Sequence, residues 1–405
     1  MTDPSDRRDP RHWRHATRLV RGGTMRSQFG ETSEAIYLTS GYAYDSAEQA
    51  AARMAGEEPG FVYSRYANPT VRMLEERLQL LEGAEAGRVT ASGMGAISAA
   101  MTAPCRAGDR VVAAAALFGS CRWIVGTLLP RFGIETEFVD GTDLDAWARA
   151  LSRPAKLVLV ESPSNPLLDA VDLPAVAEMC RKAGARLVVD NVFATPILQR
   201  PLELGADIVT YSATKHMDGQ GRVLAGAVLG PADWIEEHLD PYLRHTGPAP
   251  SPFNAWVILK GLETLAMRVE AASRNAARVA DALASHPGVA AVRYPGREDH
   301  PQRPVHARQM TSGGTLVAVS LKGGRAAAFK ALNALQLVDI SNNLGDSKTL
   351  ACHPASTTHR TLSEKDRAMI GLDESWLRIS VGLEDPEDVT ADLLAALDAA
   401  VGTPI

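Results

Sequence analysis

The sequence predicts an α/β protein with three parts: a large domain built on a mostly parallel sheet covered by helices, a smaller α+β C-terminal domain, and an N-terminal arm. Three features of the 405-residue chain indicate this fold. Short β-branched runs alternate with helical stretches from about residue 86 onward. A long helical stretch over residues 252–286 separates this region from a mixed one. The residues before about position 60 are polar and irregular, which favours an arm over a core.

The runs in the first half have the composition of buried strands and covering helices. "KLVLV" and "RLVVD" are almost continuously apolar, as is typical of strands in a parallel sheet that is covered on both faces. The helix over 171–184 has clear end signals, because Asp172 can cap it, Pro174 suits its first turn and Gly184 its end. The predicted strands cover residues 86–92, 109–117, 134–140, 156–160, 186–190 and 206–212, and the predicted helices cover 95–105, 121–133, 143–153 and 171–184.

The C-terminal part is predicted to be a smaller mixed unit. The stretch over 252–286 is predicted to form one long helix that links the two domains. Candidate strands follow over 313–321 and 376–383, and Asp385 can cap a last helix. We therefore expect an arm over residues 1–67, the large domain over 68–265 and the C-terminal domain over 266–405.

Composition argues against several classes of partner. A net charge of -6 gives no reason to expect nucleic acid or an anionic membrane surface. No apolar run approaches the ~20 residues that span a bilayer, and the charged start lacks the apolar core of a signal peptide. The four cysteines show no CxxC spacing and the histidines no HExxH, so we expect neither a disulfide framework nor a metal site. The sequence predicts a cytoplasmic protein.

Glycines after the first predicted strand indicate a phosphate site. In "RVTASGMGAISAA" a strand runs into Gly93 and Gly95 and a helix then begins, so backbone N–H groups and the helix dipole can bind a phosphate. Dinucleotide binding would require an acid at the end of the next strand. That strand ends in Leu117 and Phe118, which favours the phosphate of another ligand.

Two further strand ends carry charged residues. Asp190 closes "RLVVD", where a buried carboxylate needs a cation or strong donor, although a helix cap is the alternative. Lys215 in "SATKHMDGQGR" follows the strand over 206–212. In a poorly solvated pocket its amine loses its proton easily and attacks a carbonyl, although a solvated loop lysine is the alternative. Because the carboxyl ends of parallel strands meet at one edge of a sheet, these groups are expected to share a ligand.

One molecule combines the groups that these residues would bind. Ser212 and Thr214 can hydrogen-bond a phosphate beside the N–H groups of Gly93 and Met94. Phe118 can stack on a ring, Asp190 can keep a pyridine nitrogen protonated, and Lys215 can bind an aldehyde. Pyridoxal phosphate carries all of these groups, and we expect it as the cofactor.

Six motifs resemble the Cys/Met-metabolism family of pyridoxal-phosphate enzymes. They are "YSRYANPT", "ASGMGA", "ESPSNP", "VVDNVFATP", "SATKHMDGQGR" and "LRISVGLED", and they follow one another across about residues 17–400. The family includes cystathionine synthases and lyases, methionine γ-lyases and acylhomoserine sulfhydrylases. The resemblance implies an aspartate-aminotransferase-like large domain.

The resemblance also implies a role for each matching residue. Lys215 would bind the cofactor covalently and act as the catalytic base, Asp190 would pair with the pyridine nitrogen, and Asn165 would face the ring hydroxyl. Arg378 would bind the substrate carboxylate through a bidentate fork, although an ion pair within the small domain is the alternative. The residues implied to bind the phosphate are Gly93, Met94, Ser212 and Thr214 of one chain, with Tyr63 and Arg65 of its neighbour.

The resemblance therefore implies an active site shared between subunits of a homodimer, and a tetramer built from such dimers. Tyr63 would also assist proton transfer at the neighbour's Lys215. Small-molecule substrates, and neither nucleic acid nor a membrane, are the implied partners.

Three departures from the family pattern narrow the implied activity. Phe118 stands where many relatives have Tyr, and Ser120 stands where methionine γ-lyases have a cysteine. Asn343, an expected substrate contact, and Lys348 replace the usual Ser and Glu of synthases and lyases. The implied activity is a transferase of methionine biosynthesis that replaces the succinyl group of O-succinyl-L-homoserine by sulfide, giving L-homocysteine. Open alternatives are an O-acetyl donor, cystathionine γ-synthase or γ-lyase chemistry, and a non-catalytic cofactor-binding protein.

Overall fold

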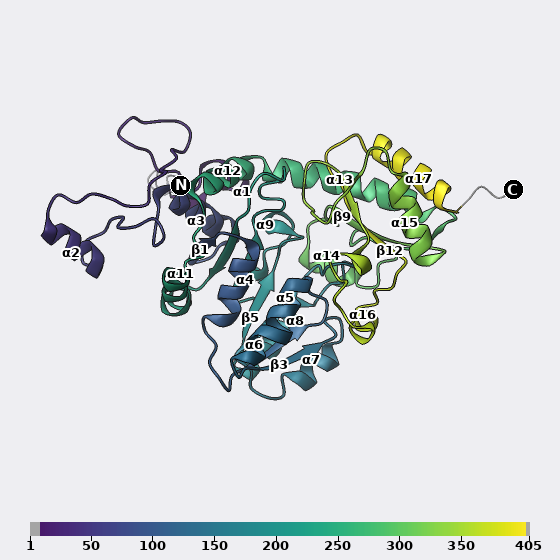
Figure 1. Cartoon of the computed structure of the whole chain (residues 1–405), viewed down its shortest axis with the longest axis horizontal. Coiled ribbons are helices and arrows are strands. Elements are labelled where there is room, and N and C mark those ends of the chain that lie inside the picture. The colour runs from purple at the N-terminus through teal and green to yellow at the C-terminus, as the bar shows by residue number, and fades with distance from the viewer. Residues whose placement is uncertain (1–8, 402–405) are drawn as a thin grey trace, which may run out of the picture. The chain divides into compact units, whose positions relative to one another are not determined.

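The structure, a computed structural model, describes residues 9–401 (Figure 1). The first eight residues of the predicted arm and the last four of the predicted C-terminal domain lie outside these residues. The chain divides into two compact units, which are described separately. The first comprises the chain up to residue 104 with 210–214 and 222–264, and the second comprises 105–209, 215–221 and the chain from 265 onward. The predicted domain boundaries stay a prediction.

The first unit holds helices from the N-terminal part and from the middle of the chain. Its elements are α1 (His15–Arg21), α2 (Ala47–Ala55), α3 (Pro69–Glu82), β1 (Ala86–Thr90), α4 (Gly93–Thr102), β7 (Gly226–Gly230), α10 (Ala232–Trp234), α11 (Asp240–Thr246) and α12 (Pro252–Glu263), with short turns of 3₁₀ or π helix at Pro10–His12 and Ile235–Leu239. β6 (Ile208–Ser212) belongs to both units.

The second unit holds two groups of strands with their helices. The first group comprises β2 (Arg110–Ala114), α5 (Gly119–Trp123), α6 (Leu129–Arg131), β3 (Glu135–Val139), α7 (Leu144–Ala150), β4 (Leu157–Glu161), α8 (Leu173–Ala183), β5 (Arg186–Asp190) and α9 (Thr195–Leu198), with short helical turns at Ile124–Leu128 and Pro201–Leu204. The second comprises α13 (Leu265–Ala284), β8 (Val289–Arg293), α14 (Arg303–Gln309), β9 (Leu316–Leu321), α15 (Gly324–Ala334), β10 (Asp339–Ile340), β11 (Leu350–Cys352), α16 (Glu364–Met369), β12 (Trp376–Ser380) and α17 (Pro386–Val401), with a 3₁₀ turn at Pro354–Ser356.

The larger sheet confirms the predicted α/β class. Its seven strands lie in the order β1-β7-β6-β5-β4-β2-β3. β2, β3, β4 and β5 pair in parallel, while β1 runs antiparallel to β7. Every residue of β2 and β4 is buried, in agreement with their continuous apolar sequences. The carboxyl ends of β4 and β5 therefore present Glu161 and Asp190 side by side.

The smaller sheet contains more strands than the sequence pattern predicted. Its five strands lie in the order β10-β11-β12-β9-β8, and only β10 and β11 pair in parallel. β9 and β12 are the two predicted strands, and both are buried along their whole length. β8 is partly exposed and β10 has two residues, so neither carries a clear apolar pattern.

Local capping signals were reliable for α8. Asp172 Oδ1 accepts a hydrogen bond from Ala175 N at 3.3 Å, and Gly184 ends the helix with a positive φ of 70°.

By contrast, the prediction of one helix over 252–286 is wrong, because α12 ends before Thr264 and α13 begins at Leu265. Leu262 and Leu265 are both fully buried, so the apolar pattern continues through the break and conceals it.

Part of the predicted arm packs into the first unit. Leu19 of α1 is buried, and Arg77 of α3 donates to Gly22 O at 2.7 Å and forms a buried ion pair with Glu34. Figure 1 shows the following segment, which carries α2, as largely extended chain. Among the described residues, none of the helices is long and apolar enough to cross a membrane.

Candidate active site

Lys215, three residues after β6, has a partly buried amine. Its Nζ donates a hydrogen bond to Asn343 Oδ1 at 2.6 Å. Burial, reinforced by the positive charge of Arg378, lowers the pKa of the Lys215 amine from 10.5 to about 8. The neutral, nucleophilic form is therefore far more abundant near neutral pH than for an exposed lysine. This setting differs from that of a solvated loop lysine.

Arg378, in the middle of β12, is almost completely buried. Its Nη1 donates to Asn165 Oδ1 at 2.9 Å, and its Nη2 donates to the carbonyl oxygen of Asn342 at 2.9 Å. Nε of Arg378 has no hydrogen-bond partner among the described residues. These contacts orient a guanidinium without giving it a carboxylate partner, in contrast to the ion pair that was the alternative for Arg378. The hydrogen bond between Arg378 and Asn165 joins two candidate site residues that the sequence did not predict to be in contact.

Two buried carboxylates lie at the ends of the neighbouring strands β4 and β5. Asp190 Oδ1 accepts a hydrogen bond from Val192 N at 3.2 Å, and Glu161 Oε2 accepts one from Phe118 N at 2.8 Å. Burial raises the pKa of Asp190 to about 7, and burial together with the charge of Asp190 raises the pKa of Glu161. A cation beside Asp190 would stabilise its ionised form.

Glu161 is a residue that sequence reasoning missed. It ends "LVLVE" in the same way that Asp190 ends "RLVVD", so the same signal was available. Glu161 accepts a hydrogen bond from the backbone N–H of Phe118, the residue just before α5. This contact holds the start of α5 at the end of β4, and it thereby positions the half-buried Phe118 ring.

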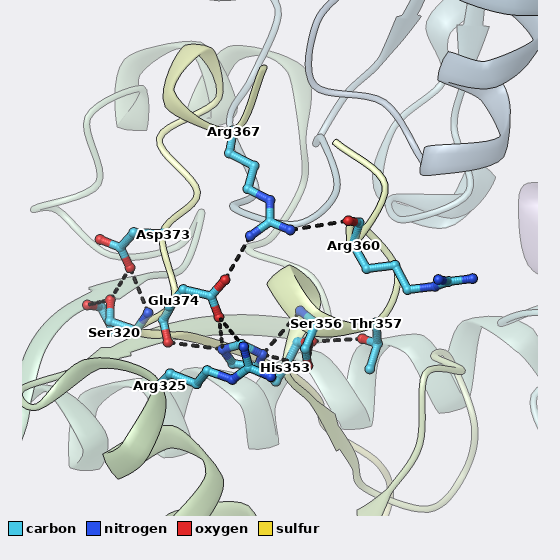
Figure 2. Close-up of polar contacts among 10 residues, drawn as sticks. Ser320, Arg325, His353, Ser356, Thr357, Arg360, Arg367, Asp373 and Glu374 are labelled. Atoms are coloured by element: carbon cyan, nitrogen blue, oxygen red, sulfur yellow. Dashed lines mark hydrogen bonds and ion pairs between the residues drawn. The ribbon is translucent and has the colours of Figure 1, made fainter. Parts of the chain in front are cut away.

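His359 is a second missed residue, in the loop that joins β11 to β12 and contains α16. It is completely buried, and burial, with the charge of Arg378, lowers the pKa of its imidazole to about 4. Figure 2 shows the polar contacts that hold both ends of this loop. At one end, His353 Nδ1 and Ser356 Oγ lie 2.8 Å apart, and at the other Arg367 Nη1 donates to Glu374 Oε1 at 2.8 Å. His353 Nε2 lies 3.0 Å from Glu374 O, so the two ends are joined.

The candidate phosphate residues belong to the first unit. Ser92 caps α4, since its Oγ accepts a hydrogen bond from Gly95 N at 3.1 Å. A Cβ atom on Gly93 would lie 2.5 Å from Ser212 Cβ, so only glycine permits this approach of α4 to the end of β6. Thr214 Oγ1 lies 3.1 Å from Ala225 N. The structure thus brings Gly93 and Ser212 together, as predicted, at a helix N-terminus.

Tyr63 and Arg65 also belong to the first unit. The Arg65 guanidinium lies 5.3 Å from the centre of the Tyr63 ring, and it donates a hydrogen bond to Arg244 O. The Tyr63 side chain is exposed. Among the described residues, neither side chain has a recorded contact with Gly93 or Ser212.

These residues fit pyridoxal phosphate in three respects. Asp190 is a buried carboxylate that accepts a hydrogen bond from Val192 N and could accept another from a pyridinium N–H. Lys215 has the low pKa that a nucleophile toward an aldehyde needs. Gly93 and Ser212 leave backbone N–H and hydroxyl groups close together for a phosphate. Within residues 9–401, no group of His, Cys, Asp and Glu side chains has the arrangement of a metal site.

Comparisons with known proteins agree with this chemistry. Residues 16–398 match the family described as Cys/Met metabolism PLP-dependent enzyme, in which PLP is pyridoxal phosphate. The O-succinylhomoserine sulfhydrylase of Mycobacterium tuberculosis is 53% identical over 405 residues, which span 98% of this chain and 100% of the relative. The O-succinylhomoserine sulfhydrylase of Pseudomonas aeruginosa is 48% identical over 383 residues, 95% of either chain.

A solved structure from Campylobacter jejuni shares the fold. It is 31% identical, has a TM-score of 0.91, and the match covers 95% of this chain and 100% of the other. That protein carries N'-pyridoxyl-lysine-5'-monophosphate, a cofactor bonded to a lysine.

Proposed function

The chain belongs to the Cys/Met metabolism family of pyridoxal-phosphate-dependent enzymes, and we propose that it converts O-succinyl-L-homoserine and sulfide to L-homocysteine and succinate. Two relatives that are 53% and 48% identical carry the name of this activity. The structural observation that carries the proposal is the partly buried Lys215 amine, with its contact with Asn343 and its pKa of about 8. This amine can serve as both nucleophile and base near neutral pH.

The candidate site residues named above would bind the cofactor. Lys215 would bond to its aldehyde, Asp190 would accept a hydrogen bond from the pyridinium N–H, and Phe118 and Asn165 would contact the ring. Its phosphate would be held by Gly93, Met94, Ser212 and Thr214, with Tyr63 and Arg65 of a neighbouring subunit. When bound, pyridoxal phosphate supplies an electron-withdrawing ring that stabilises negative charge at the substrate Cα.

Substrate orientation and proton transfer would be carried out by the residues around the substrate. Arg378 binds the substrate carboxylate through its fork and so orients the Cα–H bond toward Lys215. Lys215 Nζ would remove the Cα proton and release it to solvent, and the neutral amine would then remove a Cβ proton, so that succinate leaves from Cγ. After hydrosulfide has bonded to Cγ, Lys215 returns the protons. Because Phe118 has no hydroxyl, Lys215 carries these transfers with the help of the neighbour's Tyr63.

A steady-state comparison tests the donor and the nucleophile. We expect the highest kcat/KM with O-succinyl-L-homoserine among the succinyl, acetyl and phospho donors, and homocysteine as the product with sulfide. Higher kcat/KM with O-acetyl-L-homoserine would favour an acetylhomoserine sulfhydrylase, and efficient cystathionine formation from cysteine would favour cystathionine γ-synthase. Without sulfide, we expect slow release of 2-oxobutyrate, ammonia and succinate, whereas rapid release would favour a γ-lyase.

The assembly and the compartment belong to the same proposal. A shared active site requires a dimer, and we propose a homotetramer built from two such dimers. All four cysteines are free, which suits a reducing compartment such as the cytoplasm.

A further inference from the structure

A polar cavity of about 300 Å³ lies within the second unit. It is lined by the end of β2, by residues that follow β2, β3 and β4, by the end of β8, by the segment before α14, and by the end of α16 with the two residues after it. Its lining includes none of the residues proposed above to bind the cofactor or the substrate. The volume lies at the lower end of the range of small-molecule sites.

Ser164 shows that the cavity suits a polar occupant. It lines the cavity and is 2% exposed, yet its hydroxyl has no hydrogen-bond partner among the described residues. Gln302, in the segment just before α14, also lines the cavity. Its buried Oε1 atom likewise has no hydrogen-bond partner among the described residues. Buried polar groups in folded proteins are almost always hydrogen-bonded, so a ligand that supplies partners would be favoured here.

The charged groups of the cavity indicate which charges the two ends of that ligand would carry. Arg293 Nη1 donates to Asp169 Oδ1 at 2.8 Å, which uses one of the five N–H groups of the guanidinium. Asp140 is a second carboxylate in the lining, and its Oδ1 accepts hydrogen bonds from the N–H and hydroxyl of Thr142. Burial raises the pKa of Asp169 to about 6, Arg293 opposes this shift and Asp140 adds to it. Two carboxylates beside one guanidinium leave a net negative charge, which a ligand ammonium would balance.

We propose that this cavity binds one free α-amino acid with a short apolar side chain. The ammonium group would lie between Asp140 and Asp169, and the carboxylate would accept from Arg293 and from the Ser164 hydroxyl. The apolar side chain would pack against Val171 and Ile370, which also line the cavity.

The cavity shares two chain segments with the candidate active site. Ser164 precedes Asn165, and Ala116 of the lining lies two residues before Phe118. An occupant would therefore contact the segments that carry two of the proposed ring-side residues.

Equilibrium dialysis with labelled L-norvaline tests the proposal. The holoenzyme is first reduced with borohydride, which fixes the cofactor on Lys215 and stops its exchange with amino acids. Loss of the visible cofactor absorbance on reduction reports separately on the proposed function. We expect one L-norvaline bound per chain, and at least tenfold weaker binding of n-butylamine and of pentanoate, which each lack one charged group.

Cavity variants and a matched control locate the binding. Asp140→Asn and Arg293→Gln should each weaken L-norvaline binding at least tenfold. Asp140 is exposed, so its substitution tests the site even if Arg293→Gln does not fold. Arg308→Gln is the control, because it breaks an arginine–aspartate contact of 2.7 Å, to Asp172, that does not line the cavity. The absence of saturable binding, unchanged affinity in Asp140→Asn, or equally tight binding of n-butylamine would overturn the proposal.

Discussion

At the scale of single residues, burial and the charge of Arg378 lower the pKa of Lys215, the candidate nucleophile, which donates a hydrogen bond to Asn343. Asn343 Oδ1 accepts from Lys215 Nζ and so favours the protonated amine, whereas burial and Arg378 disfavour it. The folded-state pKa of about 8 lies below the ordinary 10.5, so the neutral amine forms as the pH rises through about 8.

We expect the capture of pyridoxal phosphate by cofactor-free protein to increase with pH around a midpoint near 8. In Asn343→Ala this midpoint should fall, because an acceptor of the protonated amine is lost. Absorbance of the bound cofactor after rapid mixing, measured across pH, gives the midpoint. Asn342→Ala is the control, since the side chain of Asn342 is exposed and only its carbonyl contacts Arg378. An unchanged midpoint in Asn343→Ala, or an equal fall in Asn342→Ala, would contradict this account.

Arg378 gives a second prediction at this scale. Its two terminal nitrogens are held by Asn165 and by the carbonyl of Asn342, so its fork has a fixed orientation. Arg378→Lys should raise KM and also lower kcat, because one ammonium cannot reproduce the fork. We expect kcat/KM to fall about 10- to 100-fold, as for the loss of one charge-assisted hydrogen bond.

Arg186→Lys is the matched control for Arg378→Lys, because Arg186 forms an exposed pair with Asp207 at 3.0 Å. It should leave both constants near their original values. If kcat stays unchanged in Arg378→Lys, the arginine does not orient the substrate for reaction.

At the scale of elements, the start of α4 depends on one glycine. Gly93→Ala would place a methyl group 2.5 Å from Ser212 Cβ and push α4 away from the end of β6. Cofactor affinity should therefore fall at least tenfold, as measured by absorbance titration of cofactor-free protein with pyridoxal phosphate. Gly95→Ala is the control two residues along the same helix, where a Cβ would meet Ser92 Oγ at an ordinary 3.5 Å. Similar affinities of the two variants would show that the approach of α4 to β6 does not govern binding.

At the scale of the whole molecule, the proposed roles of Tyr63, whose side chain is exposed, and of Arg65 in a neighbour's site can be tested with mixed subunits. We expect subunits carrying Arg65→Ala and subunits carrying Lys215→Ala to complement each other. In a mixed dimer, one site would combine a native Lys215 with a native Arg65 from the other chain. Activity measured after unfolding and refolding the two inactive variants together should exceed that of either alone.

The control for complementation mixes Lys215→Ala subunits with the double variant Arg65→Ala and Lys215→Ala. No site in this mixture contains a native Lys215, so no activity should return. If mixed dimers of the two single variants form, as shown by mass-tagged subunits, but remain inactive, each site is built within one chain.

The sequence by itself determined the features that depend on neighbouring residues. The near-continuous apolar runs specified the buried strands of the larger sheet, and Asp172 with Gly184 specified the ends of α8. The charged and small residues at strand ends made Asp190, Lys215 and the glycine turn at Gly93 candidate ligand-binding residues, because ligands bind at the strand ends of a parallel sheet.

Only the tertiary structure decided which side chains meet across the chain. The contact between Lys215 and Asn343 joins positions 128 residues apart, and that between Arg378 and Asn165 joins positions 213 apart. The break at Thr264 was hidden because buried leucines continue on both sides of it. Local patterns record the burial and turns of a segment, whereas partners that are distant in the chain are selected by packing, which leaves no periodic signal in the sequence.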